Sequence, residues 1–170
     1  VSARVRSRPP ERCGTISSMS ATVAILNQKG GVGKTTVTLG LASAAASAGR
    51  RVLVVDLDPQ ASATWVLGLD PAGDLPGTRS DQSTIADVLE RRGVPIGTTV
   101  RPSTWDPSIL VVPGDRRLQG LESADPDRLR TALAEVHDEY DAILVDCPPS
   151  LGSLSRSALT AARLALVVVE

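Results

Sequence analysis

The chain has 170 residues and a formal net charge of −1; 42% of its residues are hydrophobic and 22% are charged. These values are typical of one globular domain, so they exclude wholesale disorder, and the near-neutral charge gives no argument for a nucleic-acid or membrane surface. No apolar run approaches the ~20 residues that a membrane-spanning helix needs.

The first 18 residues differ in composition from the rest of the chain. They contain four arginines against one acidic residue, include Pro9-Pro10, and show no apolar periodicity, which predicts a disordered segment. A DNA-contacting arm and a transit peptide are alternatives for this segment. Met19, the only methionine, directly precedes the first strand-like run. We therefore expect the natural start at Met19 and the domain at 19–170.

From there, apolar runs of strand length alternate with helical patterns. Strands are expected at 22–27, 51–56, 109–112, 142–146 and 164–169, because these are continuous apolar runs of the kind found in buried parallel sheets. Helices are expected at 34–48, 61–67, 150–163, around 85–89 with a Ser83 or Thr84 cap and a stop at Gly93, and after Asp125-Pro126. The segments 70–82 and 94–108 read as irregular. This alternation predicts an α/β fold with a doubly wound, mostly parallel sheet of about five strands.

Two of the helices have a predicted buried face. In the helix at 34–48 it comprises Val37, Leu41, Ala44 and Ala48, with Gly49 as the stop. In the helix after Asp125 it comprises Leu129, Leu133, Val136 and Tyr140. His137 lies on the opposite, polar face of that helix and is expected to be solvated.

A Gly-rich segment, Asn-Gln-Lys-Gly-Gly-Val-Gly-Lys-Thr-Thr at 27–36, joins the first strand to the first helix. Glycines let successive main-chain N–H groups turn toward an anion at a helix N-terminus, so the segment predicts a phosphate site. It holds the only two lysines among 18 basic residues: Lys34 can reach β- and γ-phosphates, and the Thr35 hydroxyl can ligate Mg²⁺. The predicted nucleotide-binding residues are Lys29, Gly30, Gly31, Val32, Gly33, Lys34, Thr35 and Thr36.

Carboxylates follow two of the predicted strands. Asp56 and Asp58 come at the end of 51–56, and Asp146 ends 142–146. Because the carboxyl ends of parallel strands line one crevice, these carboxylates are expected near the Gly-rich segment, where they can hold Mg²⁺ directly or through water. Asp56 could instead be a turn former or helix cap. Cys13 and Cys147 form no Cys/His cluster, which argues against a zinc site and favours a reduced, cytoplasmic setting.

The P-loop pattern requires a glycine at position 28, where this chain has Gln28; the segment instead fits the deviant Walker A form, Lys-Gly-Gly-x-Gly-Lys-Thr, with Lys29 as the additional lysine. With RVLVVDLDPQASAT and YDAILVDCPPSLG, it resembles the three nucleotide motifs of ParA-type (Soj-like) partition ATPases, over roughly 19–170. This branch of P-loop NTPases also contains MinD and the nitrogenase iron protein. The Asp58-Pro59-Gln60 sequence is closer to ParA than to MinD, and the iron protein's cluster cysteines are absent.

The resemblance implies an ATPase that binds ATP and Mg²⁺ and forms a homodimer with two nucleotides at the interface. Lys34 would hold the subunit's own phosphates and Lys29 would cross to the partner subunit's phosphates. Thr35, Asp56 and Asp146 would support the metal, and Asp58 would position or activate the hydrolytic water.

The resemblance also implies a biological setting. The function would be chromosome or plasmid partition, or the positioning of another cargo, with slow hydrolysis stimulated by a ParB-type partner and with non-specific DNA binding in the cytoplasm, on the nucleoid. The family's sheet has seven strands in the order 3-2-4-1-5-6-7. We therefore expect this chain to be C-terminally truncated and to leave its last strand as an exposed apolar edge.

Two alternatives remain open at this point. One is a non-catalytic nucleotide-binding or regulatory module. The other is a MinD-like membrane-associated ATPase, whose C-terminal amphipathic helix this sequence could not show.

Overall fold

The computed structural model describes residues 20–70, 83–90, 94–121 and 125–169. The predicted tail 1–18, Met19, most of the segment 70–82 and the helix stop at Gly93 lie outside the described residues. In chain order the elements are β1 (Ala21–Leu26), α1 (Lys34–Ser47), β2 (Val52–Asp56), α2 (Ser62–Val66), α3 (Ile85–Glu90), β3 (Arg101–Pro102), β4 (Ile109–Val112), α4 (Pro126–Ala134), β5 (Ala142–Asp146), α5 (Ser153–Ala161) and β6 (Leu164–Val167).

The strands form one sheet in the order β3-β4-β2-β5-β1-β6, and all neighbours except β3 and β4 are parallel. The predicted doubly wound α/β fold is therefore confirmed. When the five parallel strands alone are numbered along the chain, their order is 3-2-4-1-5, in agreement with the order that the family resemblance implies. β5 pairs with both β1 and β2, so it lies between these two strands.

The expectation that 94–108 is irregular throughout was wrong at one point. Within it, β3 pairs antiparallel with β4, with Arg101 opposite Val111 and Pro102 opposite Leu110. A two-residue strand is too short to show a period, and Pro favours an edge position because it donates no hydrogen bond. The sequence pattern therefore carried no signal for it.

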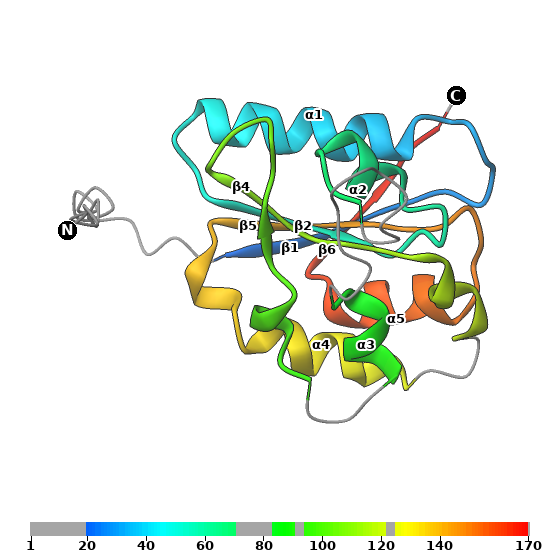
Figure 1. Cartoon of the computed structure of the whole chain (residues 1–170). Helices are drawn as coiled ribbons and strands as arrows, with labels where there is room; N and C mark the ends of the chain where they lie inside the picture. Colours follow the sequence, from blue (N-terminus) through cyan, green and yellow to red (C-terminus); the bar gives the residue numbers. More distant parts are fainter. Residues whose placement is uncertain (1–19, 71–82, 91–93, 122–124, 170) are drawn as a thin grey trace.

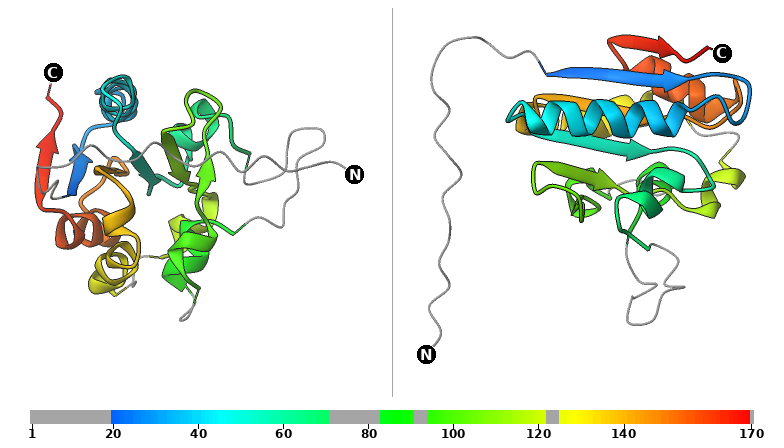
Figure 2. Two further views of the ribbon diagram at one scale, coloured as in Figure 1. Left: turned by 90° about the vertical axis from the view of Figure 1, so that its left-hand side faces the viewer. Right: turned by 90° about the horizontal axis from the view of Figure 1, so that it is seen from above.

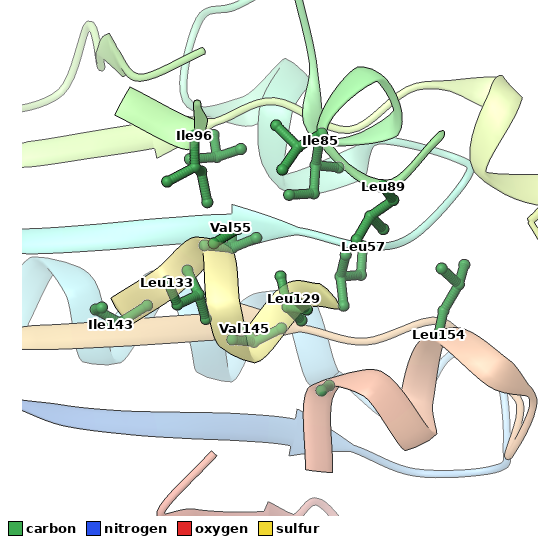
Figure 3. Close-up of a cluster of buried hydrophobic side chains, with 14 of the residues drawn as sticks. Val55, Leu57, Ile85, Leu89, Ile96, Leu129, Leu133, Ile143, Val145 and Leu154 are labelled. Atoms are coloured by element: carbon green, nitrogen blue, oxygen red, sulfur yellow. The ribbon is translucent and has the colours of Figure 1, made fainter. Parts of the chain in front are cut away.

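Helices cover both faces of the sheet (Figure 1). α1 and α2 lie on one face, over a core that includes Ile25, Val54 and Leu144. α3, α4 and α5 lie on the other face, where alternate strand residues such as Val55 and Val145 meet side chains from these helices (Figure 3). Alternate residues of each strand thus point to opposite cores, which explains why the strands read as continuous apolar runs.

The predicted buried face of the first helix was wrong at Leu41, Ala44 and Ala48, whereas Val37 is half-buried and packs against the core. α1 buries Thr38, Leu39, Ala42 and Ala46 against the sheet, whereas Leu41 is 40% exposed and Ala44 and Ala48 are exposed. The helix carries small apolar residues on all sides, so spacing alone could not select the side that packs. Its end was predicted correctly: Gly49 follows with φ of +72°, a conformation that glycine adopts without strain.

The fourth helix matches its prediction. The Asp125 carboxylate accepts a hydrogen bond from the Asp127 main-chain N–H at the helix start. The helix itself ends at Ala134 and a 3₁₀ turn, His137–Glu139, continues toward β5. The predicted stripe is buried along its whole length, at Leu129, Leu133, Val136 and Tyr140.

β6 forms one edge of the sheet. It pairs with β1, beside which it lies in the view from above (Figure 2, red beside blue). All four of its residues are exposed, among them Leu164 and Val167 at 56% each, so the expected apolar edge is confirmed. No helix among the described residues is long and apolar enough to cross a membrane.

The register of the central strands positions the site. Asp56 at the end of β2 is the Cα partner of Asp146 at the end of β5, and Ile25 near the end of β1 is the partner of Asp146 on the other side. β1 then runs into the Gly-rich segment, which leads into α1 (Figure 1). The carboxyl ends of three neighbouring strands and the first turn of α1 therefore meet at one end of the sheet.

Candidate functional site

The Gly-rich segment forms a loop that ends in the N-terminus of α1. Gly31 and Gly33 have φ of +80° and +90°, values that side-chain-bearing residues rarely adopt. Gly33 is the N-cap, and no side chain caps the first-turn N–H groups. A 14-residue helix whose first N–H groups lack a side-chain cap presents donors and the positive end of its dipole, the arrangement that binds phosphate.

The two lysines of the loop have different environments. Lys34 is buried, and its ammonium group donates a hydrogen bond to the Lys29 carbonyl oxygen at 3.3 Å. Lys29 is exposed, while its main-chain N–H donates to Asn27 Oδ1 at 2.8 Å. Asn27 also donates from its side chain to the Val168 carbonyl oxygen just after β6. The base of the loop is therefore fixed to the residue that follows β6; Lys34 is buried in the loop and Lys29 is exposed.

A strand-end carboxylate is joined to the first turns of α1. The Thr35 hydroxyl donates to Asp146 Oδ2 at 2.7 Å. The Thr38 hydroxyl shares its proton between Asp146 Oδ1, at 3.1 Å, and the Lys34 carbonyl oxygen, at 3.0 Å. Burial raises the pKa of the Asp146 carboxyl, and the two hydroxyls and the Lys34 ammonium oppose that shift.

Asp56 and Asp58 lie beside this group. Asp56 is completely buried, and burial, followed by repulsion from Asp146, raises the pKa of its carboxyl to about 7, with bonds from Thr64 and Asp58 opposing the shift. Asp58 is half-buried and acts electrostatically on Asp146, as does Lys34. The Thr35 hydroxyl thus contacts Asp146, and the charges of Lys34 and Asp58 act on that carboxyl group.

The arrangement can hold a phosphate chain and a divalent cation. The described residues contain no group of three or more His, Cys, Asp or Glu side chains that could bind a metal by itself. Mg²⁺ commonly uses one or two protein oxygens and takes its other ligands from water and substrate phosphates. The Thr35 hydroxyl and the Asp146 carboxylate, in contact at the start of α1, fit that requirement.

The predicted residues lie where the sequence placed them along this crevice, but their individual roles stay predictions. Gly30, Gly31, Val32 and Gly33 form the loop, and Thr36 follows in the first turn of α1. Among the residues that the structure describes, Thr64 and Asp58 are the hydrogen-bond donors to the Asp56 carboxyl, and the Gly-rich loop supplies none.

Sequence reasoning did not identify Thr38, Thr64 and Gly114. Thr38 lies one turn after Lys34 and could have been found from helical spacing. Thr64 lies eight residues after Asp56 in α2, where its residue type gives no signal, and Gly114 reaches the site through the pairing of β4 with β2, for which the chain carries no local signal.

Two side chains outside this crevice test other predictions. Cys147 is a buried free thiol whose pKa burial raises to about 12, so it is not poised as a nucleophile. Cys13 lies outside the described residues. His137, expected to be solvated, is half-buried, and its Nε2 lies 3.1 Å from the Ser20 carbonyl oxygen beside β1. That expectation was wrong because the chain turns after α4 and brings His137 back to the sheet.

Comparisons with known proteins agree with this geometry. A family model described as an AAA domain matches residues 20–170. Sporulation initiation inhibitor protein Soj from Bacillus subtilis is 37% identical over 161 residues, which are 89% of this chain and 59% of that protein. The chain spans about half the length of the curated relatives it matches.

Solved structures show the same likeness. Cobyrinic acid a,c-diamide synthase from Mycobacterium smegmatis, with a bound ATP analogue and magnesium, superposes with a TM-score of 0.78 at 35% identity. The match covers 88% of this chain and 60% of that protein. The septum site-determining protein MinD from Pyrococcus horikoshii, complexed with Mg-ADP, has a TM-score of 0.71 at 31% identity, and the match covers 89% of this chain and 58% of that protein.

Proposed function

The chain belongs to the AAA-domain family and, within it, to the ParA/Soj-type partition ATPases, and from that membership we propose that it binds ATP with Mg²⁺ and hydrolyses it. The bound nucleotides lie at the interface of a homodimer. The cycle drives chromosome or plasmid partition, or the positioning of another cargo. The supporting comparisons come from proteins about twice as long, so the activity is proposed for this sequence as part of such an ATPase.

The observation that carries the proposal is the contact between Thr35 and Asp146. A hydroxyl in the first turn of α1, directly after a loop with two left-handed glycines, donates to the carboxylate that ends β5. The loop supplies donors for the phosphates, and the contact joins the two protein oxygens that Mg²⁺ needs beside them. A Gly-rich turn with only a structural role requires neither the hydroxyl nor the buried carboxylate.

Each predicted residue then has a defined task. The N–H groups of Gly30–Thr36 and the Lys34 ammonium bind the subunit's own phosphates, while Thr35 and Asp146 hold Mg²⁺, which neutralises phosphate charge as the phosphoryl group is transferred. Asp58, half-buried at the crevice, orients the hydrolytic water or accepts its proton. A metal-supporting role for Asp56 stays a prediction.

Lys29 is proposed to act on the partner subunit. Lys29 is exposed, whereas Lys34 is buried. A cation supplied across an interface to a transferring phosphoryl group accelerates hydrolysis in the manner of an arginine finger. Further partners are a ParB-type stimulator and non-specific DNA, and the setting is the cytoplasm.

The test is Mg²⁺-dependent ATP binding by calorimetry together with ATP turnover, with and without double-stranded DNA. Lys34→Ala should weaken ATP binding roughly 10- to 100-fold, the equivalent of a charge-assisted hydrogen bond. Asp58→Ala should keep binding and lose about 10²-fold or more in turnover, as removal of a general base does. Lys29→Ala should keep binding and lose turnover that depends on the dimer.

Asp138→Ala serves as the control, because Asp138 is fully exposed at the opposite, amino end of β5. If the wild-type chain binds ATP but Asp58→Ala hydrolyses it at the wild-type rate, the assignment of Asp58 is wrong. If the wild-type chain binds ATP without any turnover, the result favours the non-catalytic nucleotide-binding module.

A further inference from the structure

Three donors surround the buried carboxyl group of Asp56. The main-chain N–H and the hydroxyl of Thr64 donate to Oδ2 at 2.8 and 2.7 Å. The main-chain N–H of Asp58 donates to Oδ1 at 3.1 Å. Loss of any one bond would leave a buried polar group without that partner, which is unfavourable. The carboxyl group is therefore held in one orientation.

The Thr64 hydroxyl makes a second bond that extends this network to β4. Its oxygen accepts from the Gly114 main-chain N–H at 3.0 Å, so the hydroxyl both donates and accepts. A Cβ at Gly114 would lie 2.6 Å from the Asp56 carbonyl oxygen, closer than any real Cβ contact, so this approach requires glycine. Thr64 thus joins the ends of β2 and β4 to α2.

The same network ends in the turn that carries Asp58. The Gln60 N–H donates to Asp58 Oδ1 at 2.9 Å, and the Ala61 N–H donates to the Asp58 carbonyl oxygen at 2.8 Å. Ala61 has φ of +53°, the one positive value among the described non-glycine residues. This conformation is unfavourable for an L-residue, so it persists only where the surroundings hold it.

We propose that Thr64 and Asp56 are positioning residues for Asp58. Thr64 fixes the Asp56 carboxyl, the Asp56 carboxyl binds the Asp58 N–H, and this bond sets the direction in which the Asp58 side chain enters the crevice. The inference rests on the proposed function, in which Asp58 acts on the hydrolytic water. It assigns a role to Thr64, whose side chain is completely buried. Among the described residues, its hydroxyl bonds to Asp56 and Gly114 and not to the Gly-rich loop.

Thr64→Val is the main variant, because valine keeps the side-chain shape and the main-chain N–H but removes the hydroxyl. Thr64→Ser restores the hydroxyl. Thr99→Val is the matched control: Thr99 is also completely buried, and its hydroxyl donates to the Ile96 carbonyl oxygen in a distant 3₁₀ turn. The first measurement is NMR hydrogen exchange of the Asp58 amide in the nucleotide-free chain, referenced to the amides of β5.

We expect the Asp58 amide to exchange about 5- to 10-fold faster in Thr64→Val, the equivalent of one lost hydrogen bond. Thr64→Ser and Thr99→Val should leave the ratio to β5 unchanged. The second measurement separates turnover from binding. In Thr64→Val, kcat should fall roughly 10- to 100-fold, as it does when a reacting group is misplaced, while the Kd for ATP with Mg²⁺ is retained, and Thr64→Ser should recover kcat.

Unchanged Asp58 exchange in Thr64→Val would overturn the inference, whether or not the chain hydrolyses ATP. Faster exchange with a wild-type kcat would overturn the positioning role as well. Failure of the wild-type chain to bind ATP would instead refute the proposed function; the exchange comparison would then still decide whether Thr64 holds the backbone of Asp58.

Discussion

Lowering the pH should stabilise the nucleotide-free chain against unfolding through Asp56, and Asp56→Asn should remove that stabilisation. Burial, with repulsion from Asp146, raises the pKa of the Asp56 carboxyl from 3.8 to about 7. Between these two values the folded chain binds more protons than the unfolded chain. By linkage, the free energy of unfolding that this group contributes therefore falls as the pH rises from about 4 through about 7.

The size of the effect follows from the shift. A pKa raised from 3.8 to about 7 corresponds to roughly 4 kcal/mol in full, and more than half of it is lost between pH 5 and pH 8. Burial also raises the pKa of Asp146, so the wild-type chain alone cannot isolate Asp56. Subtracting the pH dependence of Asp56→Asn removes the contribution of Asp146 and of the remaining groups.

The assay is urea unfolding of both chains at pH 5, 6, 7 and 8 without nucleotide or Mg²⁺. The two chains are compared by the slope of the free energy of unfolding against pH. Their absolute stabilities are not compared, because the Asn amide places a donor against the Thr64 or Asp58 donors and lowers stability at every pH. Asp127→Asn, at an exposed carboxylate, is the control and should keep the wild-type slope. Parallel curves for the wild type and Asp56→Asn would refute the reasoning, since Asp56 would then ionise in the folded chain at its ordinary pKa.

Three further predictions concern the rest of the fold. Arg117→Ala should cost about 1 kcal/mol in urea unfolding, because it removes the guanidinium that bonds to Asp87 and Asp115, both largely buried, while the guanidinium itself is 43% exposed. Arg130→Ala, in an exposed pair, should cost under about 0.5 kcal/mol, and equal effects would contradict this. In α1, Gly40→Ala should raise the free energy of unfolding by about 0.5–1 kcal/mol, and after the helix Gly49→Ala, at positive φ, should lower it by about 1 kcal/mol. If thermal unfolding shows that both substitutions change stability in the same direction, this reasoning is wrong. Val167→Lys on the exposed β6 should reduce concentration-dependent association in light scattering without loss of stability, and unchanged scattering would show that this edge does not drive association.

The parallel strands were predictable because each is a continuous apolar run bounded by polar or turn-forming residues. β4 and β5 have the predicted bounds, and β1, β2 and β6 differ by one or two residues. The inner strands β2 and β5 are buried on both faces, so no choice of face enters their prediction, whereas the edge strand β6 is exposed. The buried stripe of α4 was predictable for a related reason: its apolar positions alternate with charged ones, so only one side of the helix can pack.

The packing of α1 could not be derived in the same way. Its residues are small on every side, and burying Leu39 or Leu41 differs little in free energy until the sheet is in place. The contact of Thr38 with Asp146 selects the side that packs, because a buried carboxylate without that donor would be costly. Here the site orients the helix, and the hydrophobic pattern follows from that orientation.

The limit of sequence reasoning at the site has the same origin. Asp56, Asp58 and Asp146 could be placed because each directly follows a strand, and parallel strands end at one edge of a sheet. The residues that support them could not be placed. Gly114 approaches Asp56 only through the strand order β4-β2-β5, which brings together strand ends that are 50 residues or more apart in the sequence. Thr64 lies eight residues after Asp56 and looks like any small polar residue in a short helix, yet its hydroxyl is bonded on both sides in a completely buried position. A buried hydroxyl with both bonds satisfied contributes rigidity where it lies, and at this position the segment it rigidifies is the turn that carries Asp58.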